Sequence, residues 1–177
     1  GEIAGKSSNM AHAAKKADQL LINKGIPSSG TTVTSCDADA LPHPKYFSAL
    51  AYQFLSDTRR FDHLYQGAIM FYNNIWRIPL PNRFLSTLNS MWNLAFLSQE
   101  SKLINFSTYS LSFATAKEVG FWAVDVIPED YHMFFSVFFA RGEHVRVRPI
   151  FLPVLVDAAE SHGFIRTFVN QYEQSKR

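Results

Sequence analysis

Hydrophobic positions recur along the chain at two spacings, one typical of helices and one typical of strands. Between residues 47 and 55, apolar side chains fall at i, i+3, i+4, i+7 and i+8, which predicts a helix with one buried stripe. The side chains of that stripe are Phe47, Leu50, Ala51, Phe54 and Leu55. Residues 145–150 instead alternate between apolar and polar, which predicts an edge strand.

The same reasoning places elements along most of the chain. Residues 10–21 are rich in helix formers, and the Gly25-Ile26-Pro27 sequence ends that helix. The other predicted elements are a short strand within 31–40, a strand at 64–71, a helix from near 82, a strand or tight turn at 109–114, a short helix at 115–119, a helix from 128 to 142 and a last helix from about 158. Strands that alternate with helices predict an α/β fold, with a layered sheet flanked by helices.

The predicted helix near residues 82–97 carries many large apolar side chains, including Trp92. Two interpretations fit this composition. A helix of this kind packs into a core, or it lies at a membrane interface. The core-packing interpretation is the one we favour from the sequence.

Composition narrows the class of protein. The chain has 177 residues, of which 47% are hydrophobic, so one domain with a substantial core is expected. A formal net charge of +2 and the lack of a Lys/Arg block argue against nucleic acid as a partner. The single cysteine, Cys36, excludes an intrachain disulfide and fits a reducing compartment. No apolar run reaches the roughly 18 residues that a bilayer span needs.

Two carboxylates follow the first predicted strand. In an extended chain alternate side chains share a face, so Asp37 and Asp39 should point the same way. Paired carboxylates at the end of a strand suit Mg²⁺ or Mn²⁺ shared with substrate phosphates, because Mg²⁺ takes only one or two protein carboxylates and keeps several waters. The sequence therefore offers Asp37 and Asp39 as candidate metal ligands.

Two further polar clusters have both a structural and a functional interpretation. Glu129 and Asp130 follow Pro128 at a predicted helix start, where acidic side chains also stabilise the helix dipole. Gln174 and Arg177 lie three residues apart, on the same side of the last predicted helix, and could simply be a polar helix end.

Together these clusters resemble a known family. Asp37-Ala38-Asp39, then Glu129-Asp130-Tyr131, then Gln174-Ser175-Lys176-Arg177 are similar to the ordered motifs of processive family-two glycosyltransferases of the cellulose-synthase-like membrane type. In that family the order is Asp-x-Asp, an acidic pair often written Thr-Glu-Asp, and Gln-x-x-Arg-Trp. Lys6 and Asn9 resemble a Lys-x-x-Asn segment ahead of the metal site.

The resemblance implies a fold and a setting. The fold would be a partial GT-A fold, and residues 1–177 would be one domain, a fragment of a catalytic domain without its N-terminal nucleotide-binding half and its flanking transmembrane helices. The parent enzyme would act at the cytoplasmic face of a membrane, reached through segments absent here, and the fragment itself would be soluble. Pro128 replaces the family's Thr, and the sequence stops before the motif's Trp.

The resemblance also implies a reaction, the inverting transfer of a sugar from a nucleotide-diphosphate sugar to a glycan or lipid acceptor. Asp37 and Asp39 would hold Mg²⁺ or Mn²⁺, which stabilises the departing phosphate. Asp130 would be the base that takes the acceptor's proton, with Glu129 as its supporting neighbour.

Three more residues receive binding roles by the same resemblance. Lys6, Gln174 and Arg177 would contact the donor or the acceptor, and a planar Arg fork suits phosphate well. Because the nucleotide-binding half is missing, the isolated fragment is expected to bind donor weakly and to be inactive.

Two other classes stay open. The chain could be a catalytically inactive fragment or interaction module of the same fold. It could also be a metal-dependent phosphohydrolase, although the nucleophilic Asp-x-Asp of that class usually has Thr or Val where Leu41 stands here.

Overall fold

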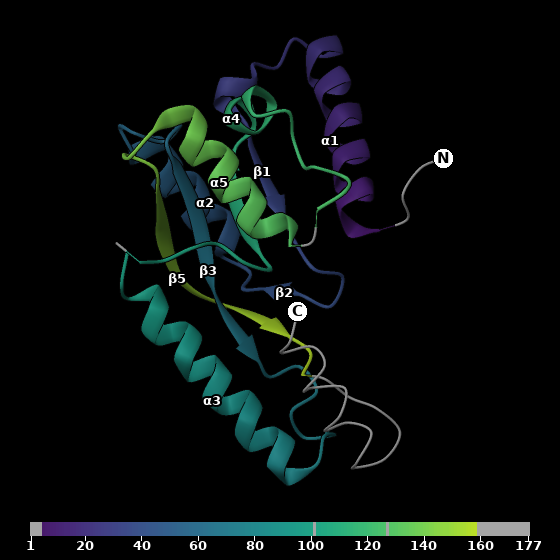
Figure 1. Ribbon diagram of the computed structural model, residues 1–177, viewed down its shortest axis with the longest axis vertical. Coiled ribbons are helices and arrows are strands. Elements are labelled where there is room, and N and C mark those ends of the chain that lie inside the picture. The colour runs from purple at the N-terminus through teal and green to yellow at the C-terminus, as the bar shows by residue number, and fades with distance from the viewer. Residues whose placement is uncertain (1–4, 101, 127, 159–177) are drawn as a thin grey trace.

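The structure is a computed structural model that describes residues 5–100, 102–126 and 128–158, and it contains a five-stranded sheet flanked by helices (Figure 1). The strand order is β1-β4-β3-β5-β2, in which β3 and β5 run parallel and the other neighbours run antiparallel. The strands are β1 (Thr32–Ser35), β2 (Leu41–Pro42), β3 (His63–Phe71), β4 (Tyr109–Ser112) and β5 (Arg146–Val156). The helices are α1 (Lys6–Asn23), α2 (Tyr46–Ser56), α3 (Leu80–Leu97), α4 (Phe113–Glu118) and α5 (Glu129–Arg141), with a 3₁₀ turn at Ser28–Gly30. The prediction of a mixed α/β fold is confirmed.

The two faces of the sheet carry separate cores. On one face, Leu64, Leu111 and Val147 pack with residues of α1, α4 and α5. On the other face, Tyr65 and Ile150 pack against α2. Neighbouring residues of β3 thus serve opposite faces, as the alternation of side chains along a strand requires. Figure 1 shows α5 crossing one side of the sheet with α2 behind it.

The first strand is shorter than predicted. It ends at Ser35, and Asp37 and Asp39 lie in a turn closed by a 3.0 Å hydrogen bond from the Ala40 amide to the Asp37 carbonyl oxygen. The expectation that the two carboxylates share one face of a strand is therefore wrong. The chain then forms β2, which the sequence analysis missed because a two-residue strand gives no periodic signal.

Two other predictions are corrected in part. The predicted edge strand at residues 145–150 is the first part of β5, which extends to Val156. Strand β5 lies between β3 and β2 and is therefore not at the edge of the sheet, although β2 pairs with it only at Val154 and Leu155. The predicted stripe of α2 is rotated, because Tyr46 is buried and Phe47 is 59% exposed. Because Tyr46 and Phe47 are both aromatic, either could begin the buried stripe of this helix. Packing against β5 selects the stripe that begins with Tyr46.

Helix α3 departs most from expectation. Its buried residues are Asn82, Ser86, Ser90 and Leu97, and most of its other large apolar side chains point outward. Those exposed side chains include Leu80, Phe84, Leu88, Met91 and Trp92. Serine faces β3 because its small side chain lets the helix approach the strand closely, and Ser90 Oγ accepts a 3.0 Å hydrogen bond from the Phe71 amide. The core-packing interpretation of its apolar stripe is wrong.

The predicted last helix, with Gln174 and Arg177, lies outside the described residues. In the part of the chain that the structure describes, no helix has both the length and the apolar character needed to cross a membrane.

Candidate functional site

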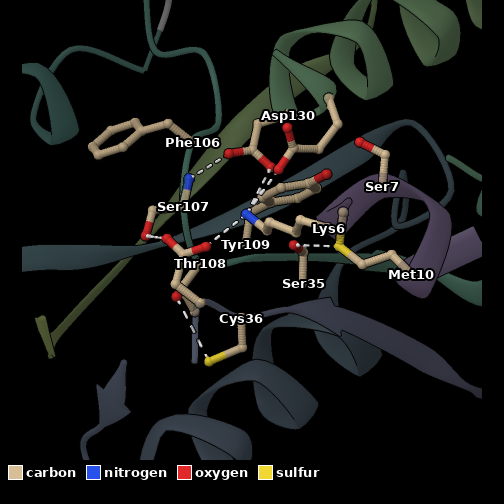
Figure 2. A network of polar contacts seen from close by, with 12 residues as sticks. Lys6, Ser7, Met10, Ser35, Cys36, Phe106, Ser107, Thr108, Tyr109 and Asp130 are labelled. Carbon is tan, nitrogen blue, oxygen red and sulfur yellow. Dashed lines mark hydrogen bonds and ion pairs between the residues drawn. The ribbon is translucent and has the colours of Figure 1, made fainter. Parts of the chain in front are cut away.

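Three segments that are distant in sequence meet at the ammonium group of Lys6. Lys6 Nζ, at the start of α1, lies 2.6 Å from Asp37 Oδ1, 2.9 Å from Glu129 Oε1 and 3.9 Å from Asp130 Oδ1. Asp37 follows β1, and Glu129 and Asp130 open α5. Figure 2 shows the lysine reaching across to the carboxylates of α5. Four of the residues that the sequence analysis selected therefore form one cluster.

The loop before β4 fixes two of these carboxylates. The Ser107 amide donates a 2.7 Å hydrogen bond to Asp130 Oδ2, and the Ser107 hydroxyl donates a 2.6 Å hydrogen bond to Asp37 Oδ2. Asn105 Nδ2 donates a 3.0 Å hydrogen bond to the carbonyl oxygen of Asp130. Ser107 has φ 56, a backbone conformation that is uncommon for a residue with a side chain. The loop therefore holds Asp37 and Asp130 in one arrangement at the cost of some backbone strain.

Ser107 was missed in the sequence analysis. It belongs to the run Asn105-Phe106-Ser107-Thr108, which has no motif spacing and no periodicity. Its role depends on a positive φ and on two contacts with distant segments, and neither leaves a signal in a single sequence.

The partners of Glu129 and Asp130 separate the two interpretations that the sequence left open. A capping carboxylate accepts hydrogen bonds from its own helix, but α5 has no side-chain cap, and these two carboxylates contact Lys6 and Ser107. The helix dipole still favours their negative charge. Their contacts, however, point to the cluster and away from simple capping.

Burial dominates the electrostatics of Asp130. It raises the pKa of the carboxyl from its ordinary 3.8 to about 6. Lys6 and the Ser107 amide oppose this rise, whereas the neighbouring carboxylates Glu129 and Asp37 add to it. A carboxyl with a pKa near 6 is mostly ionised at neutral pH and still binds a proton readily, which suits a general base.

Asp37 and Lys6 are held in their ionised forms. Burial alone would raise the pKa of Asp37, but hydrogen bonds from Lys6 and Ser107 outweigh it and lower that pKa. Burial would also lower the pKa of Lys6, but its contacts with Asp37 and Glu129 raise it above its ordinary value. Lys6 is therefore a permanent cation within an acidic cluster.

One oxygen of the cluster is left without a donor. Asp130 Oδ1 is buried, and no hydrogen-bond donor of the described residues reaches it. A base needs such an open lone pair to accept a substrate proton. Because the atom is buried, a hydroxyl group would reach it only after a neighbouring group moves. The Lys6 side chain, which is 36% exposed and whose Nζ lies 3.9 Å from this oxygen, is one such group.

Asp39 has different partners from Asp37. Asp39 Oδ2 accepts a 3.0 Å hydrogen bond from the Asp157 amide, just after β5, and the Asp39 carbonyl oxygen accepts one of 2.8 Å from Asn73. No group of three or more His, Cys, Asp or Glu side chains in the described ranges is arranged to hold a metal ion. The all-oxygen set of carboxylates nevertheless has the chemistry that a hard cation such as Mg²⁺ prefers.

No protein-family model matches the chain, and no curated protein matches it. We therefore infer a function from the cluster itself.

Proposed function

We propose that this chain is part of a glycosyltransferase with a GT-A-like fold, which transfers a sugar from a nucleotide-diphosphate sugar to an acceptor hydroxyl with inversion. The observation that carries the proposal is the meeting of Lys6, Asp37, Glu129 and Asp130, from three distant segments, around one ammonium group. A structural ion pair needs one carboxylate for one cation. Three carboxylates around one lysine leave an excess of negative charge, which contributes to the raised pKa of Asp130. Perturbed pKa values of this kind are typical of functional sites.

In this proposal Asp130 accepts the proton of the attacking hydroxyl. Its position on the first turn of α5 and its bond to the Ser107 amide fix the carboxylate, and the raised pKa keeps it able to take a proton near neutral pH. Glu129 neutralises Lys6 and so keeps the lysine from lowering the pKa of Asp130 further. The carboxylate acts on the face opposite the departing diphosphate, which gives inversion at the anomeric carbon.

The reaction also needs positive charge at the departing diphosphate. Lys6 supplies one cation. On the strength of the sequence resemblance alone, Asp37 and Asp39 would hold Mg²⁺ or Mn²⁺, which when bound supplies electrostatic stabilisation of the leaving group. Gln174 and Arg177 stay in the proposal as donor or acceptor contacts on the strength of the sequence resemblance alone.

An inactive fragment or interaction module is the second candidate. The buried Oδ1 of Asp130 and the ion pairs that already engage Asp37 and Glu129 with Lys6 favour it for the chain in isolation. The two candidates differ in whether Asp130 is needed for turnover.

The test compares Asp130→Asn with Asp125→Asn, a matched change at an exposed acid in the loop before α5. Both variants would be expressed from the complete reading frame and assayed for release of nucleoside diphosphate from a panel of nucleotide sugars with Mg²⁺ or Mn²⁺. We expect Asp130→Asn to lower turnover by about 10² to 10⁴-fold while donor affinity is kept, and Asp125→Asn to stay near wild type. Wild-type turnover by Asp130→Asn would reject the role of the base, and no turnover with any donor would favour the inactive module.

A further inference from the structure

A largely apolar cavity lies beside the carboxylate cluster. It has a volume of about 420 Å³ and is lined by residues that include Trp92, Phe96, Leu103, Phe106, Tyr131 and Phe135. This volume falls within the range of roughly 300 to 1,000 Å³ that is usual for small-ligand sites. The cavity therefore has room for a small molecule or for part of a larger one.

The cavity and the cluster share two segments of the chain. Phe106 lines the cavity, and the next residue, Ser107, binds Asp37 and Asp130. Tyr131 also lines the cavity, and it directly follows Asp130. Figure 2 shows the Phe106 ring on the side of its loop that faces away from the lysine. The lining of the cavity and the cluster are thus joined through two pairs of consecutive residues, Phe106–Ser107 and Asp130–Tyr131.

The lining limits the kind of ligand. Among the side chains that line the cavity, polar groups come from Lys102 and Tyr131, and the rest are apolar. An extended polypeptide segment would bring backbone N–H and C=O groups that need hydrogen-bond partners when they are buried. A saturated or isoprenoid chain carries no such groups and meets no penalty there.

The helices on either side extend the apolar surface. Trp92 is 65% exposed on α3, and Phe135 is 45% exposed on α5, with Phe139 one turn further along at 82%. Contiguous patches of solvent-exposed apolar side chains mark interaction sites or ligand-binding grooves. The surface continues from the cavity along α3 through Met91 and Leu88.

We propose that this cavity binds the apolar chain of an amphiphilic acceptor, so that the hydroxyl of its head group is presented to Asp130. The acceptor class is then a lipid-linked molecule and not a free glycan. The role of this ligand as an acceptor rests on the proposed function, but the binding of an apolar chain does not. Binding and transfer can be measured separately.

The experiment uses two probes with the same head group, decyl β-glucoside below its critical micelle concentration and methyl β-glucoside. Isothermal titration calorimetry on the full chain should show decyl β-glucoside binding at least about 100-fold more tightly, because each buried methylene adds about 0.8 kcal/mol. Tryptophan emission from the chain, in which Trp92 is the tryptophan that lines this cavity, should shift on binding of the decyl probe only.

Two matched variants locate the site. Phe135→Glu places a carboxylate at the rim of the cavity, and Phe139→Glu places the same charge on the same helix, on a more exposed residue that is not among the cavity's lining. We expect Phe135→Glu to weaken decyl β-glucoside by at least about tenfold and Phe139→Glu to change it by less than about twofold.

Three results would overturn the proposal. Equal affinity for the two glucosides would mean that the chain length is not recognised. Equal weakening by both variants would mean adsorption to the apolar surface outside the cavity. A lack of decyl binding, together with a loss of stability or of self-association in Phe135→Glu, would mean that another part of this chain or a second copy fills the cavity. If the decyl probe binds as expected and no transfer occurs, the proposed function fails and the binding site stands.

Discussion

Replacing Asp130 with asparagine tests the electrostatics of the cluster without any assumption about its reaction. Asparagine has nearly the same shape as aspartate and its carbonyl oxygen can still accept the 2.7 Å hydrogen bond from the Ser107 amide. The change therefore imitates a permanently neutral Asp130. Any pH dependence in the difference between the variant and the wild type reports the ionisation of this one carboxyl.

The magnitude follows from the raised pKa. Burial, the main cause, raises the pKa from 3.8 to about 6 in the folded chain, so folding favours the protonated form. The stability that this preference gives is fully present below pH 4 and is lost as the pH rises through about 6. A shift of about two units corresponds to about 3 kcal/mol between the two protonation states, and about 2 kcal/mol of that accumulates between about pH 4.5 and pH 7.5.

Urea denaturation of both proteins at these two pH values measures the effect. Relative to the wild type, Asp130→Asn should gain about 2 kcal/mol in unfolding free energy on going from the lower to the higher pH. Asp125→Asn, at an exposed acid, should show no such gain. A difference between Asp130→Asn and the wild type that stays constant, or falls as the pH rises, would refute the assignment of Asp130 as a carboxyl destabilised by burial.

Three further substitutions test other parts of the structure. Lys6→Met should lower the unfolding free energy by about 1 to 2 kcal/mol in urea, since it removes the cation that two close carboxylates share at a partly exposed site. Lys15→Met on the exposed side of α1 should not. Gly67→Ala would place a Cβ 2.6 Å and 2.9 Å from two packed side-chain atoms, so thermal unfolding should reveal a loss of about 1 to 3 kcal/mol, whereas Gly30→Ala meets nothing nearer than 3.9 Å and should be near neutral. Burial would raise the pKa of the Asp57 carboxyl, but hydrogen bonds from His63, the Arg59 amide and Tyr65 lower it. Asp57→Ala should therefore lower the unfolding free energy by about 1 to 3 kcal/mol at pH 7, and by less as the pH falls below about 4.

The sequence predicted the elements of the fold well where local signals were strong. The buried strand β3 was recognised from its apolar run, and α5 from Pro128 followed by acidic residues. Helix α3 was placed correctly, but its orientation was not, because a helix with apolar side chains on most sides gives no unique buried face. Tertiary contact with β3 selected the small polar side chains Ser86 and Ser90 for the inside.

The candidate site was predicted in part for a similar reason. Motif order brought Lys6, Asp37, Glu129 and Asp130 to attention, and the structure brings these four together. Asp39 differs because the turn after β1 directs its carboxylate to the Asp157 amide, and turn geometry of this kind is not encoded in a two-residue spacing. The alternation rule that paired it with Asp37 applies only while the chain is extended.

The charge balance of the cluster leads to a last prediction, which concerns metal removal. Lys6 supplies one positive charge against Asp37, Glu129 and a largely ionised Asp130 at neutral pH, so the site is negative overall. A diphosphate group that approaches it meets repulsion, and in a partly buried site solvent and salt screen that repulsion only weakly. Added positive charge should therefore be a condition for binding.

Calorimetry with inorganic diphosphate tests this condition without a sugar or an acceptor. In excess chelator we expect no measurable binding, and with Mg²⁺ or Mn²⁺ we expect binding that Asp37→Asn weakens by at least about tenfold, because that carboxylate both holds Lys6 and is a proposed ligand of the metal. Asp125→Asn, which removes one negative charge outside the cluster, serves as the control and should bind like the wild type. Equal binding of diphosphate with and without the divalent ion would mean that Lys6 alone balances the charge, and the metal-dependent part of the proposed function would then be wrong.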